Sequence, residues 1–187
     1  MTIAPAPSLL LKDFLQCSSI EDSPAWEFVN GEAVQKPMPG GQHSRLQKRL
    51  VQAIENANGG LEALPELRCT FGDRSIVPDI AILPLARVPV SVSGEIVATG
   101  IEFAPDWVIE ILSPQQQETR VTRNLLHCLR HGSQLGWLVD PLTRIVFVFY
   151  PDRLPDEMLG TDPLPVLPGI DLALTAEQVF GWLRVNP

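Results

Sequence analysis

Two acidic residues stand inside otherwise apolar stretches of the sequence. Asp79 follows Pro78 within residues 76–83, and Glu110 interrupts residues 107–112. A carboxylate inside a buried strand is costly unless it is paired with a cation or bound to a metal, so both residues are candidates for chemistry. If the two strands are neighbours, the carboxylates could converge on a hard cation such as Mg²⁺. The sequence also allows a plainer arrangement, in which each carboxylate faces solvent from the outer side of the sheet or from a strand end.

A second group of candidates is basic and belongs to a predicted helix from about Glu118 to Arg130. In helical projection this helix has a basic face and an opposite apolar face. Asn124 lies at the border, where a polar side chain could reach into a site. The basic face could follow a DNA backbone or could simply be solvated. His127 and His131 could pair on a transition metal, but no third ligand is evident. The basic face consists of Arg120, Arg123, His127, Arg130 and His131, and the apolar face of Val121, Leu125, Cys128 and Leu129.

The elements that must position these residues follow from periodicity and turn signals. Asn30-Gly31 between two short strand-like runs predicts a β-hairpin with a type I′ turn. Residues 84–105 form a long connection rich in Pro, Gly and Ser, a kind of loop that often has a function. Over residues 1–187 the pattern predicts a single domain, an α+β sheet flanked by helices. The predicted elements are a helix over 9–16 capped by Ser8, a hairpin over 26–35, a helix over 42–58, strands over 62–70, 75–83 and 106–112, a helix over 118–130, strands over 135–140 and 144–150, and a helix over 175–183.

Composition limits the class of protein. With 187 residues, 45% of them apolar and 19% charged, the chain is long enough for one sizeable core and too hydrophobic for intrinsic disorder. Its net charge is −8, so any contact with nucleic acid must be local. The three cysteines are far apart and do not suggest a disulfide framework. Because neither a signal peptide nor a membrane-spanning run is recognisable, we expect a cytoplasmic protein.

Four blocks of the sequence resemble the Uma family of putative restriction endonucleases, which belongs to the PD-(D/E)XK nuclease superfamily. Their order and spacing match the family across roughly residues 26–150. The combination is specific, whereas a Pro-Asp pair alone would not be. The blocks are Trp26-Glu27-Phe28-Val29-Asn30-Gly31-Glu32 with Met38-Pro39 and His43, then Val77-Pro78-Asp79-Ile80, then Val108-Ile109-Glu110-Ile111-Leu112-Ser113-Pro114, and last Leu135-Gly136-Trp137-Leu138-Val139-Asp140-Pro141.

The resemblance implies a restriction-endonuclease-like core, in which a mixed sheet lies between helices and an N-terminal hairpin precedes it. It implies that Asp79 and Glu110 hold Mg²⁺ or Mn²⁺, with the main-chain carbonyl of Ile111 as a further ligand. Such a metal polarises the scissile phosphate and lowers the pKa of an attacking water.

Three other residues of the first block could take part. Glu27 or Glu32 could add a third carboxylate to the metal through water. His43 lies on the apolar side of its helix and points inward. It could act in the site, or it could be a core histidine that bonds a main-chain group at the start of the helix.

One departure concerns the lysine that superfamily nucleases usually carry two residues after the glutamate. That position is Leu112 here. In the Uma family the lysine stands in the following helix instead, and the corresponding residue is Asn124. The lysines of the chain are Lys12, Lys36 and Lys48, and none is near this site in sequence.

Two functions stay open. The first is an enzyme that hydrolyses DNA phosphodiester bonds with a metal held by Asp79 and Glu110, in which Arg123 or Arg120 replaces the lysine. The second is a catalytically degenerate nuclease fold that binds DNA or a protein without turnover. Because cutting both strands of DNA needs two sites, we expect a homodimer.

Overall fold

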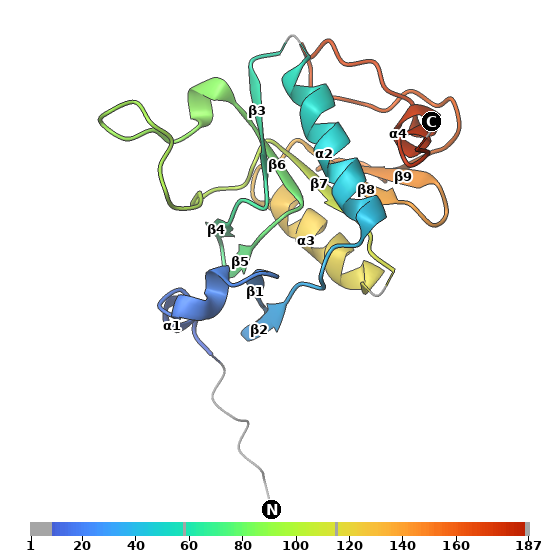
Figure 1. Ribbon diagram of the computed structural model, residues 1–187. Helices are drawn as coiled ribbons and strands as arrows, with labels where there is room; N and C mark the ends of the chain where they lie inside the picture. Colours follow the sequence, from blue (N-terminus) through green and yellow to red (C-terminus); the bar gives the residue numbers. More distant parts are fainter. Residues whose placement is uncertain (1–8, 58, 115, 186–187) are drawn as a thin grey trace, which may run out of the picture.

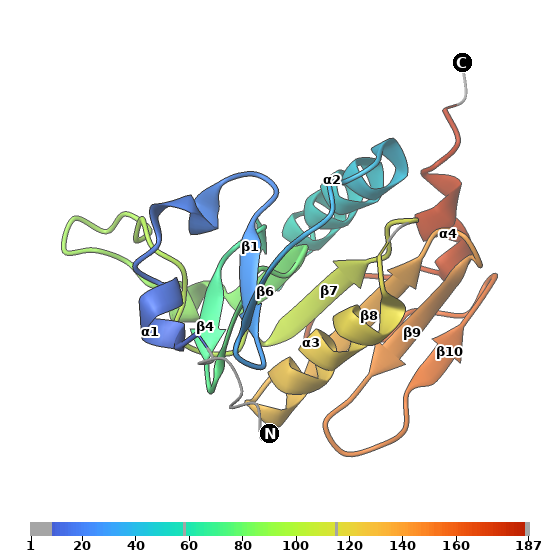
Figure 2. The same ribbon diagram turned by 90° about the horizontal axis from the view of Figure 1, so that it is seen from below.

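The computed structural model describes residues 9–57, 59–114 and 116–185. Its strands form two sheets, one of four strands and one of six. Helices cover both faces of the larger sheet, and the smaller sheet lies beside it (Figure 1, Figure 2). The architecture is therefore α+β with a mixed sheet flanked by helices, as the sequence predicts.

The smaller sheet is antiparallel and has the order β2-β1-β5-β4. Its first two strands are the predicted hairpin. Asn30 and Gly31 at its turn have positive φ angles of 55° and 81°, which a two-residue type I′ turn requires. The strands are β1 (Trp26–Val29), β2 (Glu32–Gln35), β4 (Cys69–Phe71) and β5 (Arg74–Ile76).

The larger sheet has the order β10-β9-β8-β7-β6-β3. Strands β7 and β8 are parallel and are connected by helix α3, whereas the other neighbours are antiparallel. The central strands are covered on both faces, which explains their nearly continuous apolar sequence. The strands are β3 (Leu61–Pro65), β6 (Ile80–Pro84), β7 (Trp107–Ile111), β8 (Leu135–Asp140), β9 (Ile145–Phe149) and β10 (Asp156–Met158).

Two helices define the layers of the larger sheet. Helix α2 (Gly41–Glu55) packs on one face, together with the C-terminal segment and its helix α4 (Ala176–Gly181), and α3 (Glu118–Arg130) packs on the other (Figure 2). Alternate residues of β6 serve the two layers. Ile80 and Ile82 belong to the core on the α2 side, and Ala81 and Leu83 to the core on the α3 side.

The two predicted helices beside the sheet are confirmed. Helix α3 has the predicted bounds, and α2 begins and ends within a few residues of its prediction. Leu46, Leu50 and Ile54 form the buried stripe expected of α2. Sequence periodicity was sufficient here because each helix packs an apolar stripe against the larger sheet.

The predictions of single strands over 62–70 and 75–83 are wrong, because each stretch is divided between the two sheets. The first break falls at Glu66, which has a φ of 53°. The second falls at residues 77–79, where Pro78 has no N–H to donate to a ladder. Asp79 therefore directly precedes β6 and does not lie inside a strand.

The ends of the chain differ in detail from the predictions. Helix α1 (Leu11–Phe14) is shorter than the predicted helix, and Ser8, its expected cap, lies outside the described residues. Thr175 and Gln178 form a capping box at α4. The long connection contains a 3₁₀ turn at Leu85–Arg87, and β10 was not predicted. None of the helices in the described part of the chain has the length and apolar character to cross a membrane.

Candidate metal and phosphodiester site

Asp79 and Glu110 meet where β6 begins and β7 ends. Ile80 pairs with Ile109 in the antiparallel ladder of these strands, so positions 79 and 110 come next. Opposed residues of an antiparallel pair project to the same face. The peptide N–H of Ile111 donates to Asp79 Oδ2 at 2.7 Å, which extends the contact beyond the ladder. The register thus brings the two predicted carboxylates together at the ends of two interior strands of the larger sheet.

The Asp79 carboxylate is only 1% exposed and accepts from three donors. Lys36 Nζ donates to Oδ1 at 2.7 Å, and His43 Nε2 donates to Oδ2 at 3.0 Å, beside the N–H of Ile111. Burial by itself opposes ionisation, but the Lys36 ammonium and the contact with His43 outweigh it and lower the pKa of Asp79 below its usual range. Asp79 is therefore a stable anion.

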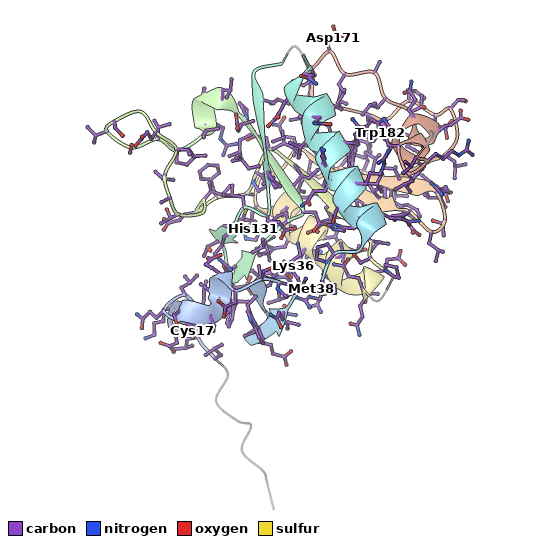
Figure 3. All side chains as sticks on the ribbon, in the orientation of Figure 1. Cys17, Lys36, Met38, His131, Asp171 and Trp182 are labelled. Carbon is purple, nitrogen blue, oxygen red and sulfur yellow. The ribbon has the colours of Figure 1, made fainter. Side chains whose placement is uncertain are left out.

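Lys36 reaches Asp79 from the segment that links the smaller sheet to α2, where Figure 3 labels it beside Met38. Its ammonium also donates to the main-chain oxygen of Val77 at 2.7 Å and to Glu66 Oε2 at 3.3 Å. The side chain is 9% exposed. Burial lowers the pKa of Lys36, but the surrounding carboxylates, above all Asp79, raise it by more, so the pKa lies above its ordinary value. The lysine therefore carries a permanent positive charge.

Glu110 is also buried, at 3% exposure, and its surroundings differ from those of Asp79. Among the described residues, no hydrogen-bond donor contacts its carboxylate. Burial and the neighbouring negative charge of Asp79 both raise its pKa well above the ordinary value. Two adjacent carboxylates thus have opposite electrostatic environments, and the uncompensated one is Glu110.

Glu27, a residue of β1, joins the smaller sheet to α3. Its Oε1 accepts the N–H of Val77 at 3.0 Å, and its Oε2 accepts from Arg120 at 2.8 Å. The amide of Asn124 lies 3.3–3.4 Å from both oxygens. Asn124 is buried, and its own Oδ1 has no partner among the described residues. The polar border position predicted for Asn124 therefore contacts Glu27.

Helix α2 closes the site from the other side. His43, at the start of the helix, uses one ring nitrogen for Asp79, and its Nδ1 has no partner among the described residues. Gln47, one turn later, donates to the main-chain oxygen of Asp79 at 2.8 Å and to Glu66 Oε1 at 3.2 Å. His43 therefore contacts a candidate catalytic carboxylate, and it is not simply a core histidine that bonds the backbone.

The basic residues of α3 do not all face solvent. Arg123 and Arg130 are exposed, whereas Arg120 is half-buried in its ion pair. The part of this basic face at His127 is not open to solvent or DNA, because His127 is 5% exposed and stacks on Phe71 with ring centroids 4.8 Å apart. The hairpin of β4 and β5 covers this side of the helix, and the main-chain oxygen of Phe71 accepts from His127 Nε2 at 3.1 Å.

Two hollows lie near Asp79, and Asp79 itself lines the first of them. The first has a volume of about 260 Å³ and is lined by His43 and Asp79, among others. The second has about 640 Å³, lies between the β1–β2 hairpin and the start of α3, and is lined by Arg120 and Arg123. Lys36 lines both hollows. The lysine thus stands between the acidic site and the basic cleft.

The residues present fit a hard divalent cation of the Mg²⁺ type. In the described part of the chain no three His, Cys, Asp or Glu side chains are grouped to hold a metal. Mg²⁺ does not need such a cage, because it commonly takes one or two carboxylates and keeps water and substrate phosphate as its other ligands. Glu110, a buried carboxylate without a donor beside a second carboxylate, is the residue that such an ion would stabilise.

Lys36 is the site residue that the sequence did not predict. The superfamily and family patterns place the lysine after Glu110, whereas Lys36 lies 43 positions before Asp79. One signal was available. Glu27 was already a candidate ligand, and Lys36 follows the second strand of the same hairpin. A hairpin that brings Glu27 to the site also brings the residue at its end.

The sheet order and the acidic pair together indicate the class of fold. A mixed sheet between helices, with an acidic pair at neighbouring strand ends, is the restriction-endonuclease-like fold that the sequence predicts. A family model described as "Uma2: Putative restriction endonuclease" matches residues 11–177. The chain therefore belongs to the Uma2 family, which confirms the resemblance.

A solved structure gives the same result. The chain is similar to a crystal structure described as a "putative nuclease belonging to DUF820" from Anabaena variabilis, with 42% sequence identity and a TM-score of 0.89. The match covers 94% of this chain and 99% of the other. No curated protein matches the chain.

Proposed function

We propose that the protein is a metal-dependent endonuclease that hydrolyses DNA phosphodiester bonds at the Asp79–Glu110 pair. One observation carries this proposal: two buried carboxylates lie where β6 begins and β7 ends, and among the described residues Asp79 forms a salt bridge whereas Glu110 forms none. A divalent cation would compensate Glu110 as Lys36 compensates Asp79. Membership of the Uma2 family and 42% identity to a protein described as a nuclease support the assignment.

The chemistry needs few protein groups. When bound, Mg²⁺ or Mn²⁺ polarises the scissile phosphate and lowers the pKa of the attacking water. Asp79 and Glu110 would hold the ion, with the main-chain carbonyl of Ile111 as a further ligand. The water oxygen would form a bond to phosphorus and release a proton to solvent, while the bond from phosphorus to one sugar oxygen breaks and that oxygen takes a proton from solvent. His43 keeps the Asp79 carboxylate in its orientation from the α2 side.

We assign Glu27 to positioning, in place of the metal contact through water that the sequence suggested. Its oxygens already accept from Val77, Arg120 and Asn124. These bonds hold the β1–β2 hairpin against α3 and against the segment just before Asp79. In this proposal Asn124 acts through Glu27 and does not reach the reacting phosphate.

The DNA backbone would enter along the second hollow, which exposed Arg123 lines together with Arg120, whose guanidinium is paired with Glu27. Arg130, exposed at the last turn of α3, would extend this contact. Because the net charge is −8, we expect these few arginines to account for binding and the affinity to fall steeply with salt. A homodimer in the cytoplasm, with one site for each DNA strand, completes the proposal.

The test is metal-dependent nicking of a supercoiled plasmid. Wild-type protein should nick with Mg²⁺ or Mn²⁺ and not in EDTA, while Asp79→Asn and Glu110→Gln should be inactive. Asp171→Asn, an exposed position far from the site in Figure 3, is the matched control and should cleave as wild type does. If wild type and both site variants are equally inert with either metal, the fold is a binding module and the proposal fails.

A further inference from the structure

The acidic centre contains more negative charge than its immediate cations compensate. Asp79, Glu110, Glu66 and Glu27 all act on the Lys36 ammonium electrostatically. Lys36 is the one lysine or arginine, among the described residues, that contacts Asp79. Lys36 is therefore the lysine or arginine whose positive charge a phosphate would meet beside Asp79.

The other basic residues near the site are already committed or point elsewhere. Arg120 is engaged with Glu27 Oε2 at 2.8 Å and lies close to the main-chain oxygen of Val34. Arg123 is exposed on the outer side of the cleft. Neither arginine contacts Asp79 among the described residues, so neither takes the place of the missing lysine there.

The position of Lys36 is fixed by the backbone on both sides. Its N–H donates to the main-chain oxygen of Ala25 at 3.0 Å, which continues the β1–β2 ladder. The next residue, Pro37, restricts φ as the chain turns toward α2. The ammonium is therefore delivered by a rigid hairpin end, which favours a preorganised electrostatic role.

The contacts of the ammonium are unequal. Those with Asp79 and with the main-chain oxygen of Val77 are both 2.7 Å, whereas the contact with Glu66 is 3.3 Å and that carboxylate is 44% exposed. One N–H of the ammonium can thus leave a solvated partner at low cost. The same side chain borders the basic cleft, from which a phosphate would arrive.

We propose that Lys36 is the catalytic cation of this site: it donates to a non-bridging oxygen of the scissile phosphate after giving up Glu66. The inference rests on the proposed nuclease function and names a residue for it. Lys36 keeps its proton throughout, and its fixed charge stabilises the negative charge that grows on the phosphate as water attacks. Lys36, at the end of the β1–β2 hairpin, thus supplies the positive charge that positions 112 and 124 lack.

The experiment compares Lys36→Met, Lys36→Arg and the control Lys48→Met, which removes an exposed lysine of α2. Lys36→Met should slow plasmid nicking by about 10²–10³, because it removes one preorganised charged donor. Lys36→Arg should recover part of the rate, and Lys48→Met should cleave as wild type does.

A second readout separates catalysis from metal binding and folding. Calorimetric titration of Mn²⁺ into each DNA-free protein should give Lys36→Met an affinity equal to or tighter than wild type, since an ammonium no longer competes for Asp79. Thermal melts identify any variant that has lost its fold, and Lys36→Arg then carries the test. Lys36→Met that cleaves at the wild-type rate would overturn the role of Lys36 and leave the nuclease proposal standing. A wild-type protein that neither cleaves nor binds Mn²⁺ would overturn both, and loss of Mn²⁺ binding in folded Lys36→Met would make Lys36 structural.

Discussion

The buried pair of Lys36 and Asp79 makes a thermodynamic prediction that does not depend on activity. The two side chains are 9% and 1% exposed and 2.7 Å apart. Lys36→Met leaves Asp79, a buried anion, with His43 and one peptide N–H, and it leaves Glu110 with less positive charge nearby. Removing one partner of such a pair exposes the desolvation cost of the other.

The magnitude follows from the burial. We expect Lys36→Met to lower the free energy of unfolding by about 3–5 kcal/mol, the cost of an uncompensated buried charge. In a chain of this size that corresponds to a drop in Tm of about 6–20 °C. Asp79→Asn should cost less, about 1–3 kcal/mol, because it also relieves the repulsion of Glu110. In the double variant neither charge is left unpaired, so the two costs should not add. We expect a coupling energy of at least about 2 kcal/mol.

The assay is urea unfolding in EDTA of wild type, both single variants and the double variant. Lys48→Met combined with Asp79→Asn is the control cycle, and it should be additive because Lys48 is exposed and makes no contact with Asp79. Additivity of Lys36→Met and Asp79→Asn to within about 0.5 kcal/mol would refute the pair, and with it the placement of the lysine at the acidic centre.

Three further predictions concern the surroundings of the pair. Glu110→Gln should raise the free energy of unfolding in EDTA at about pH 8, because it removes a buried charge without a donor, and should abolish stabilisation by Mn²⁺; urea titrations with and without metal measure both. Burial lowers the pKa of His127 to about 4, so wild type should lose stability as the pH falls from the unfolded value near 6.5 toward 4. His127→Gln, whose amide can still donate to Phe71, should lose about 1–2 kcal/mol less over that interval, and equal slopes would contradict this. Asn124→Lys should not raise plasmid nicking, because position 124 is buried against Glu27 and does not reach the phosphate, and a raised rate would contradict this role.

Local patterns were sufficient where an apolar stretch belongs to a single helix or a single strand. Helix α3 and strand β8 have the predicted bounds because a helix stripe and a buried run each leave a periodic trace. The stretch 75–83 fails because its apolar residues are continuous across Pro78, and hydrophobicity does not record which sheet each half joins. The burial of His127 could not be predicted for a related reason: it comes from Phe71, more than fifty residues away.

Some residues of the candidate site could likewise be predicted from the sequence, and others could not. Asp79 and Glu110 could be found because a carboxylate inside an apolar run is conspicuous. Their juxtaposition follows from a ladder between strands that the sequence already placed in one sheet. Lys36 is an ordinary lysine after an exposed strand, and only the docking of the smaller sheet against the larger one turns it into a buried cation.

That docking explains why the hairpin controls the geometry of Asp79. Both main-chain groups of Val77, two residues before Asp79, are bound by the hairpin: Glu27 accepts its N–H at 3.0 Å, and Lys36 donates to its carbonyl at 2.7 Å. The peptide that carries Asp79 out of the smaller sheet is therefore held from the same hairpin that supplies its counter-charge. Where position 112 holds a leucine packed toward the α3 core, a cation on β7 is not available, and the hairpin supplies charge and alignment together. A substitution that loosens the hairpin should therefore change both the ionisation and the position of Asp79. A lysine on the same strand as the glutamate would not couple these two properties to the hairpin.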